Sequence, residues 1–284
     1  MFKTRAFGLL LIGLLLMGTS ASFAQDATGT LSIYANGEDF VRQGFVSKDG
    51  WAITFDHVYI TLGAIAAYQT DPPYEAVMGD EISVINEANL PDVYTIDLAA
   101  GDEDAEPILV AEVAAPEGRY NALTWAMVPV PEGSEISSEI SDEVGDIAGY
   151  SLFVVGTATK EDTTLTFTIK IEQAYTYICG EYVGDERKGI LDADDVADLE
   201  MTFHFDHIFG DGDLPLDDGL NEGAPGFAPF AALAADGQID VDLAALEAAL
   251  SAADYQMVVD ILPTLGHVGE GHCYEAVSGY GQHE

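Results

Sequence analysis

The sequence predicts a mainly β fold, an antiparallel β-sandwich that carries a small C-terminal helical subdomain. Between residues 29 and 209, short runs of β-branched and aromatic residues alternate with turns rich in Gly, Pro, Asp and Asn. There are roughly nine such runs with no convincing helix between them, and this combination favours a sandwich over a barrel. Hydrophobic residues make up 48% of the 284-residue chain, which is enough apolar material to build a buried core.

The expected strands follow one another along most of the chain. The alternation is clearest in residues 161–171, because Leu165, Phe167 and Ile169 fall on one face and polar residues fall on the other. Such a strand has one buried face and one that contacts water. The predicted strands are 29–35, 51–62, 64–69, 93–97, 108–113, 122–128, 150–158, 163–177 and 199–209.

The pattern changes after Gly210, and we expect a domain boundary there. A loop dense in Asp, Gly and Pro comes first, and leucines at helical spacing then predict a helix over 240–250 and a second one over 252–262. We therefore divide the mature chain into a β-sandwich domain, 25–210, and a C-terminal segment, 211–284. That segment comprises the acidic loop, the two short helices and a stretch rich in His and Gly.

The N-terminus has the pattern of a secretory signal peptide. Lys3 and Arg5 precede an apolar run over 7–17, and small residues follow up to Ala24, after which cleavage is expected. An uncleaved membrane anchor is the alternative, but the run of about 11 residues is short of the roughly 20 that a membrane-spanning helix needs. No later segment is long and apolar enough to span a membrane. Residues 1–24 are thus predicted as a signal peptide, and the mature protein as periplasmic or extracellular.

The charge of the chain restricts its partners. The formal net charge is −41, and residues 1–24 hold two of the nine basic residues and none of the fifty acidic ones. Such a surface repels nucleic acid and anionic lipid. Its expected partners are a metal ion and, among macromolecules, another exported or membrane protein. A saline or acidic habitat is a second explanation for most of this charge.

The two cysteines, Cys179 and Cys273, are predicted to form a disulfide, because an exported protein meets an oxidising compartment. The Cα atoms of bridged cysteines lie only about 4.4–6.8 Å apart. The segment around Cys273 must then lie against the strand that ends at Cys179.

One short motif occurs twice, as Phe-Asp-His followed by an aliphatic and then an aromatic residue. The copies lie at 55–59 and 205–209, and in extended strands both His57 and His207 would point inward, with His204 on the other face. Neutral imidazole is the commonest metal ligand in proteins, so two such strands could share one ion. The alternative is that each is a core histidine satisfied by a backbone group.

Two further histidines, His267 and His272, lie in the glycine-rich stretch 265–273, which ends at the predicted disulfide. Glycines let a backbone fold tightly around a small centre, although the stretch also fits a surface loop with incidental histidines. All-nitrogen ligation suits zinc or copper. The candidate ligands for a zinc or copper ion are His57, His204, His207, His267 and His272.

The acidic loop is a second candidate metal site, this time for calcium. Closely spaced carboxylates are the oxygen ligands that Ca²⁺ prefers, but the loop lacks the order of an EF-hand. The candidate calcium ligands are Asp211, Asp213, Asp217 and Asp218.

Enzyme signatures are missing: there is no Gly-x-Ser-x-Gly, no His-Glu-x-x-His and no phosphate loop. We therefore expect a binding protein and not an enzyme, with a hydrolase of dispersed residues as a remote alternative.

The stretch 115–125, with its Pro-x-Gly-x-Tyr turn leading into a strand, resembles turns that recur in exported β-sandwich proteins. It is similar to the methanobactin-associated periplasmic copper-binding proteins, which also carry a His-bearing aromatic strand comparable to 203–209. That resemblance implies a periplasmic metal-binding sandwich.

The leading hypothesis is an exported protein that binds or delivers zinc or copper. The alternative is a cell-surface adhesion or structural module, stabilised by calcium and without a transition metal.

Overall fold

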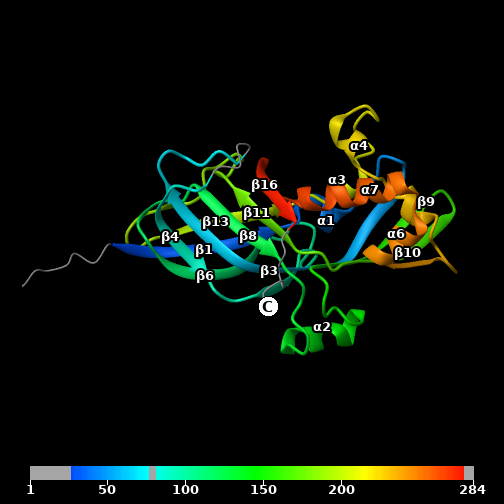
Figure 1. Cartoon of the computed structure of the whole chain (residues 1–284), viewed down its shortest axis with the longest axis horizontal. Helices are drawn as coiled ribbons and strands as arrows, with labels where there is room; N and C mark the ends of the chain where they lie inside the picture. The colour runs from blue at the N-terminus through cyan, green and yellow to red at the C-terminus, as the bar shows by residue number, and fades with distance from the viewer. Residues whose placement is uncertain (1–26, 77–80, 278–284) are drawn as a thin grey trace, which may run out of the picture.

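A computed structural model describes residues 27–76 and 81–277, and strands dominate this part of the chain (Figure 1). The prediction of a mainly β fold is confirmed. The predicted signal peptide lies outside the described residues. The strands are β1 (Thr28–Asn36), β2 (Phe45–Val46), β3 (Ala52–Thr70), β4 (Val84–Leu90), β5 (Tyr94–Asp97), β6 (Ile108–Pro116), β7 (Gly118–Arg119), β8 (Ala122–Met127), β9 (Leu152–Lys160), β10 (Thr163–Ile171), β11 (Tyr175–Cys179), β12 (Ile190–Leu191), β13 (Val196–Phe203), β14 (Gln238–Asp242), β15 (Gly266–Val268) and β16 (Gly271–Val277).

The helices are short and lie mostly in the second half of the chain. They are α1 (Glu38–Gln43), α2 (Glu135–Val144), α3 (Asp206–Phe209), α4 (Gly219–Gly223), α5 (Ala228–Ala231), α6 (Leu243–Ala249), α7 (Ala252–Ile261) and the 3₁₀ turn η2 (Leu262–Leu265). The predicted helices 240–250 and 252–262 correspond to α6 and α7. Among the described residues, no helix combines the length and apolar character needed to cross a bilayer.

Most strands belong to one curled sheet, in which both parallel and antiparallel pairs occur. Its order is β14-β10-β9-β3-β8-β11-β16-β15-β13-β1-β6, and β2, β4 and β5 also pair with β3. β1 is parallel to β13, and β10 is parallel to β14. The expectation of a purely antiparallel sandwich is therefore corrected to a mixed sheet. Parallel neighbours need a long connection, and in both pairs a long stretch of chain separates the two strands.

β3 is the strand that joins the two ends of the elongated molecule (Figure 1). It spans 19 residues and replaces the two strands predicted over 51–62 and 64–69. Its register with β8 shifts between Gly63 and Ala66, and Ala64 has a positive φ of 50°. This irregularity is a bulge, which lets one strand bend and continue instead of ending.

The C-terminal segment is part of the sheet and not a separate body. β14 pairs with β10, and β16 pairs with β11. A single cluster of buried apolar residues includes members from both sides of the boundary expected at Gly210, for example Phe167 and Phe227, whose ring centroids are 5.4 Å apart. The helices α6 and α7 thus pack on a core that they share with the strands.

The predicted disulfide is confirmed. Cys179 and Cys273 are bonded, and they lie directly opposite each other in the antiparallel pair of β11 and β16. β15 and β16 form a hairpin that lies between β11 and β13. This hairpin therefore separates β11, which ends at Cys179, from β13.

Helix α2 contradicts the expectation of no helix between the strands. Ser134 caps it by accepting a hydrogen bond from the backbone N–H of Ser137, 3.2 Å away. Ile140 and Val144, one turn apart, pack on a small cluster of buried residues around Tyr59. In Figure 1 the helix projects from one side of the body.

Candidate metal centre

Three potential metal ligands come together where β13 ends. The strand predicted over 199–209 stops at Phe203, and the chain then turns into α3. One ligand atom from each of His204, Asp206 and His207 lies within 4.8 Å of the others. The strand prediction was wrong beyond residue 203. In an extended strand Asp206 and His207 would point to opposite sides, whereas the helical turn brings both toward His204.

The β15–β16 hairpin adds two more histidines to this group. His267 and His272 are paired across the hairpin, with ring centroids 4.7 Å apart. The ring of His267 is 4.3 Å from that of His204 and 5.1 Å from that of His207. Four of the five histidines predicted as ligands thus form one cluster, which we call the histidine cluster: His204, His207, His267 and His272.

Thr264 fixes which nitrogen of two rings carries the proton. The backbone carbonyl of Thr264 can only accept, so Nε2 of His267, 3.1 Å away, is the protonated nitrogen. The Thr264 hydroxyl donates to the carbonyl of Ile261 at 2.9 Å, and its oxygen therefore accepts from Nδ1 of His207 at 2.8 Å. In the neutral rings, Nδ1 of His267 and Nε2 of His207 keep a free lone pair, which is the state that a metal ion requires.

Three buried ligand atoms of the histidine cluster and Asp206 have no hydrogen-bond partner within the described residues. They are Nε2 of His204, Oδ1 of Asp206 and Nδ1 of His267. The side chains are almost fully buried, with exposed fractions of 8%, 6% and 3%. A buried polar atom left without a partner costs about 1–3 kcal/mol, and a bound cation would satisfy all three.

Burial also sets the protonation states. Burial, with the neighbouring His204 as the second cause, lowers the pKa of His207 to about 4 and that of His267 to about 3. Burial raises the pKa of Asp206 above its ordinary value, although His204 opposes this shift. At neutral pH His207 and His267 are therefore uncharged and available as ligands.

Glu38, which the sequence analysis missed, lies behind His204. Its Oε2 is 3.6 Å from Nδ1 of His204, within ion-pair distance, and burial raises the pKa of the Glu38 carboxyl. Glu38 has a positive φ of 59°, an unfavourable conformation for a residue other than Gly, and its backbone N–H donates to Asn36. No local sequence signal could have found it, because it lies far from the histidines along the chain.

The structure does not bring His57 to the histidine cluster. His57 lies in β3, where its Nδ1 is 2.8 Å from Oδ2 of Asp97 and its ring stacks on Tyr59 at 5.3 Å between centroids. The ring is half-buried and not in the core interior. The pairing of His57 with His207 that the repeated motif suggested is thus not present.

The acidic loop is organised by the hydrogen bonds of an asparagine. The buried Asn221 donates to the carbonyls of Asp211, Leu214 and Pro215 at 2.8–3.2 Å. Asp218 caps α4 by accepting from Leu220 N at 3.0 Å. Within the described ranges, the aspartates predicted as calcium ligands, Asp211, Asp213, Asp217 and Asp218, do not form a group of three ligand atoms within 4.8 Å.

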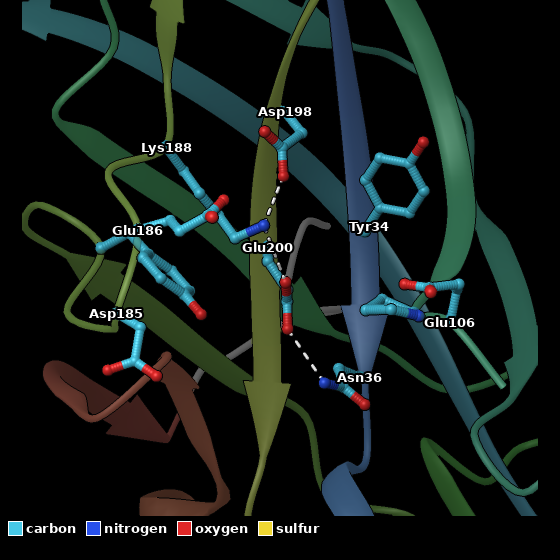
Figure 2. Close-up of a pocket in the computed structure, with 10 residues that line it drawn as sticks. Tyr34, Asn36, Glu106, Asp185, Glu186, Lys188, Asp198 and Glu200 are labelled. Atoms are coloured by element: carbon cyan, nitrogen blue, oxygen red, sulfur yellow. Dashed lines mark hydrogen bonds and ion pairs between the residues drawn. The ribbon is translucent and has the colours of Figure 1, made fainter. Parts of the chain in front are cut away.

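An acidic cavity of about 620 Å³ lies beside β1 and β13 (Figure 2). Lys188 reaches into it, forming ion pairs with Asp198 and, at 3.2 Å, with Glu200. Glu200 also accepts from Nδ2 of Asn36 at 3.0 Å. The carboxylates of β13 in this cavity are thus already paired with a cation from the chain itself.

No family model matches the sequence, and no curated protein matches it either. Among solved structures, this chain is similar to MbnP from Methylosinus trichosporium. The match covers 66% of this chain and 78% of the MbnP chain. The identity is 11% and the TM-score is 0.31. A likeness at that level supports no statement about the function of this protein.

Proposed function

We propose that this is an exported protein that binds one divalent transition-metal ion, copper or zinc, at the histidine cluster and Asp206. The observation that carries this proposal is the set of three buried atoms without hydrogen-bond partners, each of them a metal-ligand type. Buried polar atoms in proteins are nearly always hydrogen-bonded, so three such atoms in one cluster need a common explanation. A single cation provides it.

The donor set fits copper and zinc best. His204, His207 and His267 offer imidazole nitrogens, and Asp206 adds one carboxylate oxygen. Imidazole suits zinc and copper, whereas calcium and magnesium take oxygen ligands. Ligand atoms that bind one ion at about 2.0–2.1 Å lie roughly 3 Å apart, so metal binding would draw these side chains closer together.

Two features outside the cluster support an exported cation binder. The N-terminal pattern of Lys3, Arg5 and the apolar run fits a signal peptide, and the Cys179–Cys273 disulfide fits an oxidising compartment. The large excess of acidic residues raises the local concentration of cations around the protein. We propose binding or delivery of the ion, and not catalysis, as the function.

The decisive experiment compares two histidine variants in the chain that begins after Ala24. Metal is removed with a chelator, and Cu²⁺ or Zn²⁺ is titrated back by calorimetry. We expect one equivalent to bind, and His267→Ala to weaken binding by more than about 100-fold, since loss of an outer partner alone costs about 10–100-fold. His57→Ala is the matched control, because His57 lies with Asp97 and Tyr59, and it should bind like the wild type.

Two results would contradict the proposal. One is the lack of stoichiometric binding of either ion by the wild type. The other is equal loss of binding in His57→Ala and His267→Ala. A rise in melting temperature with Ca²⁺ but with neither Cu²⁺ nor Zn²⁺ would favour the calcium-stabilised structural module instead.

A further inference from the structure

A cavity of about 380 Å³ adjoins the histidine cluster. Helices α4 and α7 and strand β16, which lie close together in Figure 1, supply its walls. Leu220 and Ile261 give it apolar surface, and Thr264 and Glu275 are among its polar groups. Small-molecule sites in proteins have volumes of about 300–1,000 Å³ and are mostly apolar with a few placed polar groups. The cavity has both properties.

The side chains of the histidine cluster and Asp206 become more exposed toward this cavity. His204, Asp206 and His267 are almost fully buried, whereas His207 is half-buried and His272 is exposed. His207 and His272 are also the two histidines that line the cavity. A metal ion held by the buried ligands would therefore face the cavity on its accessible side.

We propose that the bound metal ion keeps an exchangeable coordination position that opens into this cavity, and that a small neutral nitrogen heterocycle of the imidazole class binds there. This inference rests on the proposed metal site. Metal sites that act on an outside ligand keep such an open position, whereas purely structural sites are closed by protein ligands. The heterocycle would bind the metal through one ring nitrogen and bury its ring against Leu220 and Ile261.

The charges around the cavity select against anions. Glu275 places a carboxyl group in the wall of the cavity. An oxygen of this group would accept a hydrogen bond from the second nitrogen of a bound ring. Burial raises the pKa of Glu275 to about 7, and in either protonation state the group retains an acceptor oxygen. The net charge of the whole chain is −41, which also repels anions such as azide.

The test uses Cu²⁺, because copper binds nitrogen sites at least as tightly as zinc does and its visible absorption reports its ligands. The chain that begins after Ala24 is loaded with one equivalent of Cu²⁺ and titrated with imidazole, and separately with azide. Leu220→Trp fills the cavity, and Ile261→Trp is a second variant with the same purpose. Leu216→Trp is the matched control, since Leu216 lies in the preceding loop and is 71% exposed.

We expect saturable binding of one imidazole to the copper-loaded wild type and to Leu216→Trp. In Leu220→Trp and Ile261→Trp the dissociation constant of imidazole should rise at least about tenfold, with the copper stoichiometry unchanged. The inference is overturned if imidazole leaves the spectrum unchanged, removes the copper, binds both cavity variants as it binds the wild type, or binds more weakly than azide. Failure of the wild type to bind copper at all would instead overturn the metal site itself.

Discussion

The same three residues, Phe-Asp-His, occur in two regions that serve different purposes. At 55–57 they lie inside the long strand β3, and His57 is held by Asp97. At 205–207 they lie at the turn into α3, and His207 joins three other histidines. The two phenylalanines pack on each other, with ring centroids 5.7 Å apart. The shared sequence thus sets the core contact, whereas the backbone decides what the histidine does.

This difference shows why the second copy gathers potential metal ligands and the first does not. A bulge in β3 leaves Asp56 exposed, and His57 is instead hydrogen-bonded to Asp97. A helical turn can place neighbouring side chains on one side, as it does for Asp206 and His207. The β15–β16 hairpin then adds His267 to the second copy.

The largest expected effect comes from removing the disulfide that holds the β15–β16 hairpin. This hairpin lies beside the Phe-Asp-His copy at 205–207 and not beside the copy at 55–57. Cys179→Ala combined with Cys273→Ala removes the disulfide between β11 and β16. The chain-entropy model predicts a loss of about 4.7 kcal/mol in the free energy of unfolding for a loop of this length. Copper affinity should fall as well, because β16 and β15 carry His272 and His267.

Urea denaturation measures the first effect, and copper titration measures the second. In the urea measurement, wild type treated with a reductant and without metal serves as a comparison with unchanged sequence. A loss of less than about 1 kcal/mol would show that strand pairing alone holds β16 in place.

The two phenylalanines of the motif offer a sharper comparison. Phe205 is fully buried, whereas Phe55 is only partly buried. Replacing a buried Phe by Ala costs about 3–5 kcal/mol, so we expect about 3–4 kcal/mol for Phe205→Ala and clearly less for Phe55→Ala. Urea denaturation of the metal-free proteins measures both. Equal losses would mean that the two copies contribute alike to the core.

The turn after Phe203 was the main error of the sequence analysis, and its signal was present. Phe205, Ile208 and Phe209 are all buried, and their spacing of three and four is helical and not alternating. The apolar residues Leu199, Met201 and Phe203 do alternate, and this suggested that the strand continues. The change from alternating to helical spacing after Phe203 predicts a helical turn. Such a turn can place the side chains of Asp206 and His207 on the same side.

Other parts of the site could not have been found along the chain. Glu38 approaches His204 only because β1 pairs with β13 in parallel, a long-range contact without a local signature. The mainly β fold and the disulfide were predictable, because alternation is a local pattern and two cysteines allow a single pairing. The order of strands depends on contacts between distant segments, and periodicity does not encode them.

The smallest expected effect concerns the two aspartates of the motif, and its sign depends on the metal. Asp206 is buried and Asp56 is exposed. Burial raises the folded-state pKa of Asp206 above the unfolded value, so the folded state binds the proton more tightly. The stability from this group is present at low pH and is lost as the pH rises through the folded-state pKa. Asp206→Asn removes the ionisation, and the metal-free variant should be more stable than the wild type at pH 7 by roughly 1 kcal/mol.

The same substitution should have the opposite consequence once copper is present. Oδ1 of Asp206 is one of the buried atoms without a partner, and an amide oxygen is a weaker copper ligand than a carboxylate. We therefore expect Asp206→Asn to melt above the wild type without metal and below it with saturating Cu²⁺. Asp56→Asn should match the wild type in both states. If Asp206→Asn is less stable than the wild type without metal at pH 7, the Asp206 carboxylate stabilises the fold by itself and no ion is needed to explain its burial.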